Sequence, residues 1–505
     1  MLNSKNKLFI FANGEIVRKE QNASNFVANR GGKIIFGESR VRASIMDKIR
    51  KRMKDVYNYD TGPYEDYNFN TDNEKLLIKL DWNINKNNNL TFRYNRMDAR
   101  RDKGPHPFVL SPNNSGRGPD DTSLPFRNSG YRMNNRLNSF ALEINSRSKK
   151  FSNRLFASYN RFRDYREPFS PEYPTIDIAQ DGVTYTTVGE EPFSSHNILD
   201  QDVWQFTDNF SYFLGNHVFT VGTTYDNFSF FNSFNIFRNG VFFLPYFVRP
   251  IGSTFFSLDD FFRETSPDTT INPNGPFDFN AMVGKGPFKG ENINVGQLAF
   301  YAQDEYLATP RLSLTIGIRV DIPIYNTKPV DNPFSRSLTL LGKDGKPETI
   351  DQSKLPDAIP LFSPRIGFNW DIVGDRSVQL RGGTGIFTGR LPFVWIGNVI
   401  SNPGSNPNLY PTAAPIPTKH NSSLEQSFDL NAMAPDFKWP QMWTTNLAID
   451  KKLPGDMLFT LEAIYGKDIN SVFVRNANLQ APQRYLPDGR PYYTDSTGNY
   501  KSDPN

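Results

Sequence analysis

Apolar and polar residues alternate with a period of two along most of the chain, in segments of about ten residues, and this restricts the fold more than any other feature. The clearest segment is Leu312–Asp321, in which every second residue from Leu312 to Val320 is aliphatic and the others are polar or glycine. Residues 75–84 and 365–372 follow the same pattern, with Leu77 as an exception. Successive side chains of a strand point to opposite faces, so each segment predicts a strand with one apolar and one polar face.

Weaker versions of this pattern extend over the rest of the sequence, near residues 7–17, 90–98, 137–146, 153–165, 202–213, 218–231, 294–307, 378–387, 441–452 and 457–466. Together the segments predict about 13 strands of about 9 to 14 residues, longer than the usual 5 to 6 of globular proteins.

The connections between these segments alternate between two lengths. Tight turns rich in Gly, Asn, Asp, Pro, Lys or Arg lie at 85–89, 147–152, 214–217, 309–311, 373–377 and 454–456. Polar segments of about 34 to 61 residues connect the hairpins, near 20–73, 99–136, 167–200, 232–292, 326–363 and 389–440. Soluble domains rarely contain loops longer than about 12–15 residues. This alternation is typical of a transmembrane antiparallel up-and-down β-barrel, with periplasmic turns and long extracellular loops.

Other fold classes fit the sequence less well. A soluble all-β sandwich or propeller would also alternate, but the turns recur at uneven intervals, unlike the blades of a propeller. The longest apolar stretch, residues 241–248, is too short for a membrane-spanning helix and contains Pro245. The first fifteen residues lack the apolar core of a signal peptide.

Composition argues against several functions. The chain of 505 residues has no cysteine, which excludes disulfides, thiolate nucleophiles and cysteine-based metal sites. Its 57 basic and 53 acidic residues give a net charge of +4, too small to suggest a nucleic-acid partner. The four histidines follow no metal-binding or catalytic spacing, and the glycine-rich run 382–389 does not match a nucleotide-binding loop. We therefore expect no enzyme activity and no cofactor.

Several sequence segments resemble those of a known family. Leu298-Ala-Phe-Tyr-Ala-Gln-Asp-Glu-Tyr306, followed by Leu312–Asp321, resembles a hairpin of TonB-dependent outer-membrane receptors. The segments 362–371, 379–390, 205–210 and 467–470 are similar to the Oar-type branch, whose members carry a carboxypeptidase-regulatory-like domain. The resemblance implies a Gram-negative outer membrane, a plug, contact with the TonB complex and a 22-stranded barrel. Residues 1–505 are then expected to be one partial barrel domain, without signal peptide, plug or C-terminal strands.

Two groups of residues are candidates for function. Charged residues on the polar strand faces could line the lumen or contact a plug, or simply pair with one another: Arg93, Glu143, Arg319, Asp321, Arg365, Asp371 and Arg381. Aromatic residues of the long loops could contact a ligand or hold the loops together: Phe242, Phe243, Tyr246, Phe393 and Trp395. In the first long loop, Val41, Ile45, Ile49 and Met53 predict an amphipathic helix over Val41–Tyr57, packed on neighbouring loops.

The function expected from this reasoning is binding and import of a large ligand, a peptide or polysaccharide, through a plugged barrel. Its partners are then outer-membrane lipid, the TonB complex and the ligand. A surface barrel used for adhesion, without transport, is the alternative, and a passive porin is a third possibility that would normally have shorter loops.

Overall fold

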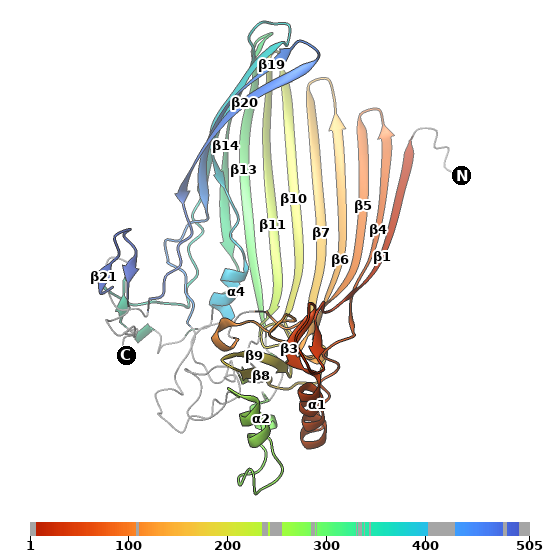
Figure 1. Cartoon of the computed structure of the whole chain (residues 1–505). Helices are drawn as coiled ribbons and strands as arrows, with labels where there is room; N and C mark the ends of the chain where they lie inside the picture. The colour runs from red at the N-terminus through yellow and green to blue at the C-terminus, as the bar shows by residue number, and fades with distance from the viewer. Residues whose placement is uncertain are drawn as a thin grey trace.

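The computed structural model describes residues 7–107, 111–234, 241–242, 255–283, 288, 290–329, 331, 336–337, 339–342, 345–401, 430–477 and 482–493. Its main feature is one antiparallel sheet of 13 strands, in which each strand pairs with the next sheet strand along the chain (Figure 1). The strands are β1 (Leu8–Asn22), β4 (Asn68–Asn85), β5 (Asn88–Lys103), β6 (Tyr131–Arg147), β7 (Phe151–Pro168), β10 (Ile198–Leu214), β11 (His217–Ser233), β13 (Glu291–Thr309), β14 (Leu312–Tyr325), β17 (Leu361–Asp371), β18 (Val378–Thr388), β19 (Gln441–Leu453) and β20 (Met457–Asn470).

Every predicted strand is present, which confirms the all-β fold and the up-and-down order. Most strands are longer than predicted, up to the 19 residues of β13. The reason is that backbone pairing continues into polar residues beyond the alternating segment, as where Asn22 pairs with Asn68. The two edges of the sheet are β1 and β20, and the described residues do not pair these edges with each other.

Alternation gives the sheet two chemically different faces. Phe206 lies opposite Tyr225, and Ile316 opposite Ile366, on a face where large apolar side chains are exposed. We call this the outer face and the opposite one the inner face. Exposed apolar side chains across many strands are what a lipid-facing surface requires.

The two ends of the sheet differ as the connections predict. Tight turns join the strands at one end, and all the long connections lie at the other, which we call the loop end (Figure 1). Among the described residues, no helix is both long and apolar enough to cross a membrane.

The long connections contain short elements of their own. They are β2 (Val27–Asn29), β3 (Glu38–Arg42), α1 (Ala43–Tyr57), η1 (Pro112–Asn114), η2 (Arg127–Ser129), β8 (Thr175–Gln180), β9 (Val183–Val188), β12 (Val241–Phe242), α2 (Leu258–Glu264), η3 (Phe279–Met282), β15 (Leu340–Leu341), β16 (Pro347–Glu348), α4 (Val394–Ser401), β21 (Arg484–Tyr485) and β22 (Pro491–Tyr492).

The first four long connections pack together around one hydrophobic core, which we call the loop cap. The first contributes Met46, Ile49 and Met53 of α1, and the other three contribute residues that include Phe126, Ile176 and Phe261. The prediction of polar loops was therefore incomplete, because these connections fold into a small domain.

The predicted helix in the first connection exists, but it begins later than expected. It starts at Ala43, because Val41 belongs to β3, where it is buried. The buried face of α1 is Met46, Ile49 and Met53, as the 3.6-residue period requires, and Ile45 lies at the edge of the core. The expected packing on neighbouring loops is confirmed.

Candidate functional site

A chain of polar contacts crosses the inner face of the sheet near the loop end. We call its members, Asp226, Gln297, Asp321, Arg319 and Arg390, the inner-face network. Arg390 pairs with Asp226, and its Nε donates to Gln297 Oε1 at 2.7 Å. Gln297 Nε2 donates to Asp321 Oδ1 at 2.8 Å, and Arg319 Nη2 donates to the same oxygen at 2.9 Å.

Sheet register explains why these residues meet. Asp226 lies opposite Gln297, and Asp321 opposite Ala299, so the side chains share the inner face on β11, β13 and β14. Asp226 and Asp321 are each only 2% exposed. A buried carboxylate is costly unless it is paired and hydrogen-bonded, so the two arginines are needed to hold these acids in place.

An apolar cluster borders this network on the loop side. The connection between β18 and β19 returns to the inner face. There the ring centroid of Phe393 lies 4.8 Å from that of Phe228 and 5.4 Å from that of Phe230. Trp439, which is fully buried, donates its Nε1 hydrogen to the Tyr325 hydroxyl at 2.8 Å. Part of this connection is thereby fixed to the inner wall of the sheet.

The seven charged residues singled out in the sequence all lie on inner-face positions, but the structure does not bring them together. Arg319 and Asp321 belong to the inner-face network. Arg365 lies on the next strand, with its guanidinium 4.4 Å above the Phe387 ring. Asp371 accepts backbone hydrogen bonds from Gly374 and Arg376, so it shapes a tight turn.

The other three lie elsewhere on the sheet. Arg381 pairs with Asp450 at 2.9 Å across β18 and β19. Glu143 pairs with Arg154 at 2.7 Å, and Arg93 lies one strand away, in register with Ala141. These contacts are those of polar ladders between neighbouring strands.

The structure does not bring the five loop aromatics together either. Phe393 is held in the inner apolar cluster, whereas Trp395 on α4 keeps 39% of its surface exposed. Phe242 pairs through its backbone with Ile176 in β8. Phe243 and Tyr246 lie outside the described residues.

Sequence reasoning missed Asp226, Gln297, Arg390 and Trp439. Asp226 and Gln297 had a usable signal, since both occupy polar-face positions in strands that were predicted. Arg390 and Trp439 had none, because both lie in a long connection whose path over the inner face depends on tertiary packing.

The loop cap contains a second polar site. Arg117 and Asp177 form an ion pair of 2.9 Å in which both side chains are fully buried. Asp177 also accepts a hydrogen bond from the Thr187 hydroxyl at 2.6 Å, and Arg117 donates to the His106 carbonyl at 2.7 Å.

Burial raises the pKa of Glu191, which lies in the same part of the loop cap, although its carboxylate accepts backbone hydrogen bonds from His106, Phe193 and Ser194. Within the described ranges, no group of three or more acidic or histidine side chains could hold a metal ion.

A family model described as an outer membrane beta barrel domain matches residues 4–503. The chain belongs to this family. It is accordingly a protein of the Gram-negative outer membrane, and the outer face described above is its lipid-facing surface.

The solved outer-membrane proteins to which the chain is similar are distant in sequence. The outer membrane transporter YddB from Escherichia coli is 13% identical, with a TM-score of 0.50, and the match covers 88% of this chain and 43% of that one. The ferric-catecholate import receptor Fiu from Escherichia coli K12 is 11% identical, with a TM-score of 0.45, and coverage of 88% and 55%. The chain thus spans about half the length of these proteins. No curated protein sequence matches it.

Proposed function

We propose that the chain is the barrel part of a TonB-dependent receptor of the Oar type, which binds a large ligand at its loop cap and imports it through a plugged barrel. The observation that carries this proposal is the folded loop cap at the mouth of a barrel wall whose fold is that of an outer-membrane transporter. The cap provides a pre-organised binding surface, and pre-organisation lowers the entropic cost of binding.

The inner-face network supports the same function. Arg319 and Arg390 keep 26% and 47% of their side-chain surface exposed on the inner face, where a plug or a passing ligand would meet them, whereas the carboxylates with which they pair are buried. Charge-assisted hydrogen bonds are strong and directional, so exposed guanidinium groups can orient a polar partner. A peptide or polysaccharide, rich in hydrogen-bonding groups, is the ligand class that we infer.

Growth of a strain with an in-frame deletion of this gene tests the proposal. The strain is compared with the wild type and with a strain lacking TonB, on defined peptides or polysaccharides as sole nutrient. Transport predicts the same growth defect in both mutants on the same nutrient.

The adhesive alternative predicts a different result. The deletion strain would then lose attachment to surfaces or cells, while the strain lacking TonB attached normally and neither strain showed a nutrient defect. That outcome would contradict import.

A further inference from the structure

The inner face of the sheet has two chemically different parts near the loop end. Over β10, β11 and β13 it is apolar, and the connection between β18 and β19 packs on it. Phe230 and Ile293 of the sheet share one core there with Ile396 of α4, which is fully buried. This part of the inner face is therefore occupied by the chain itself.

Over β1 to β7 the inner face is polar and basic instead. One row of paired residues crosses these five strands in the order Lys19, Thr71, Arg101, Met133 and Arg166. Lys103 lies two residues farther along β5 and, because side chains alternate, on the same face. We call Lys19, Arg101, Lys103 and Arg166 the basic patch.

Acidic side chains of the same face balance only part of this charge. Asp164 lies two residues before Arg166 on β7 and therefore shares the inner face with it. Glu15, the next acidic residue along β1 on this face, pairs with Lys75 at 2.7 Å. The four cations of the basic patch thus face one carboxylate, and positive charge is in excess.

The acidic residues of the loop cap beside the patch are engaged in contacts of their own. Arg166 Nη1 donates to Ser194 Oγ at 3.2 Å, which places the patch next to this segment of the cap. Glu190 Oε1 lies 3.3 Å from His196 Nε2, and the Glu191 carboxylate accepts the backbone hydrogen of Ser194. Both glutamates are buried, so they do not neutralise the patch by direct contact.

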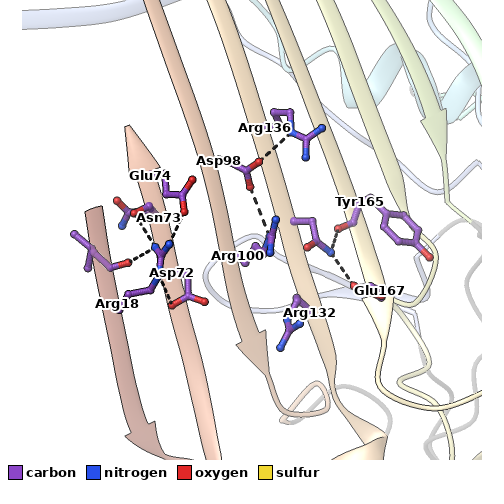
Figure 2. A network of polar contacts seen from close by, with 12 residues as sticks. Arg18, Asp72, Asn73, Glu74, Asp98, Arg100, Arg132, Arg136, Tyr165 and Glu167 are labelled. Carbon is purple, nitrogen blue, oxygen red and sulfur yellow. Dashed lines mark hydrogen bonds and ion pairs between the residues drawn. The ribbon is translucent and has the colours of Figure 1, made fainter. Parts of the chain in front are cut away.

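On the outer face at the same level, arginines are matched by acids. Figure 2 shows Arg18 between Asp72 and Glu74, and Asp98 in contact with Arg136 at 3.1 Å. The excess of positive charge is consequently a property of the inner face, which a molecule in the interior of the barrel would meet.

Amide side chains adjoin the basic patch on the inner face. Asn73 and Asn135 lie in the row next to it, in strands β4 and β6, and Asn95 and Asn160 lie two rows beyond them. An amide group both donates and accepts hydrogen bonds, and so does a hydroxyl group. Cations and amides side by side are suited to a partner that carries carboxylates and hydroxyls together.

We propose that the basic patch binds the carboxylate groups of an acidic polysaccharide on its way from the loop cap into the barrel. This inference rests on the proposed function and specifies its ligand class. Lys19 and Arg101 are exposed, so a ligand can form charge-assisted hydrogen bonds with them. A polysaccharide is favoured over an acidic peptide, because each sugar unit also offers hydroxyls to the amides. A surface of one charge sign also raises the local concentration of an oppositely charged ligand.

The test compares two forms of one oligosaccharide as ligands of the intact protein in detergent micelles. Oligogalacturonate carries a carboxylate on each unit, and its fully methyl-esterified form has the same backbone without the charge. Isothermal titration calorimetry measures both affinities. We expect the charged form to bind about tenfold or more tightly than the ester. This preference should decrease as salt is added, because exposed charges are screened.

Two double variants provide a matched comparison. R101Q/K103Q removes two positive charges from the basic patch, and K149Q/K150Q removes two from the tight turn between β6 and β7, at the opposite end of the sheet. The first should lower the preference for the charged form by about tenfold, and the second should behave as the wild type. Heat-dependent migration in gel electrophoresis shows that each variant is folded.

Four results would overturn the proposal. They are equal affinity for the charged and esterified forms, an equal loss in both double variants, equally tight binding of oligoglutamate, and no binding of oligogalacturonate. Oligoglutamate binding would indicate a site for acidic peptides, and no binding would indicate that an acidic part of a plug covers the patch.

Failure of this inference can be distinguished from failure of the proposed function. Equal affinity for both forms, together with a TonB-dependent growth defect of the deletion strain, would refute the charge selectivity alone. Charge-selective binding without such a growth defect would refute import and leave the basic patch as a binding surface.

Discussion

At the level of single residues, Arg117 and Asp177 form a fully buried ion pair within the loop cap. Removing one partner of a buried ion pair leaves an uncompensated charge, at a cost of about 3–5 kcal/mol. Arg117→Met is therefore expected to lower the free energy of unfolding of the loop cap by about this amount. Limited proteolysis at increasing temperature measures the effect.

The control for this variant is Lys51→Met on α1, which removes an ion pair to Asp55 whose partners are 78% and 54% exposed. Such surface pairs contribute about 0–1 kcal/mol. If both variants changed protease sensitivity equally, the buried pair would have no special role in the cap.

Glu191 makes the stability of the loop cap depend on pH. Because burial raises its pKa in the folded state, the protonated form is favoured there. The contribution of this residue to the free energy of unfolding is thus largest at low pH and decreases as pH rises above its ordinary pKa of about 4.3.

Glu191→Gln keeps the shape of the side chain and removes its charge. The difference in cap stability between variant and wild type is expected to grow in favour of the variant from about pH 4.3 upward. Protease sensitivity across this range measures it. A difference that stayed constant with pH would show that Glu191 does not titrate in this range.

At the level of elements, the strands could be predicted from the sequence but the packing of the loops could not. Period-two alternation is a local signal, and it identified every strand of the sheet from β1 to β20. The core of the loop cap joins residues from four connections, such as Met53 and Phe261, whose proximity no local pattern encodes.

The candidate site also contains residues that the sequence could predict and residues that it could not. Arg319 and Asp321 could be found, because they lie two positions apart on one strand face. Their connection to Asp226 through Gln297 and Arg390 could not, because Arg390 and Asp226 are separated by 164 residues. Only the register of the sheet and the path of a long connection bring them together.

Helix α1 provides a test of the cap as a packed element. Met53 is fully buried in the core of the cap, and Met→Ala in such a position costs about 2–5 kcal/mol. Met53→Ala should therefore make the loop cap markedly more sensitive to proteolysis. Ile45→Ala, at the edge of the same core, should have a smaller effect, and the reverse order would contradict the assigned helix face.

At the level of the whole molecule, the 13-stranded sheet, which we call the wall, and the loop cap are expected to lose structure separately on heating. The wall is held by a continuous ladder of hydrogen bonds within a membrane, whereas the cap depends on one small core. None of the six tryptophans belongs to the core of the cap. Tryptophan fluorescence consequently reports on the wall and its inner cluster.

Met53→Ala should thus lower the temperature at which proteases cut the cap and leave the fluorescence transition unchanged. Parallel melts of the wild type and the variant, in the same lipid, measure both quantities. A matching shift of the fluorescence transition would show that cap and wall unfold as one unit.

The shared core of the first four long connections also limits how this protein can diversify. A receptor whose loops were independent could acquire a new loop by recombination without harm to the others. Here a foreign first connection would arrive without the side chains that complement Phe126, Ile176 and Phe261, and would leave voids beneath all four. New binding specificities should therefore be inherited as a block that includes all four connections, or arise by changes on the surface of the cap.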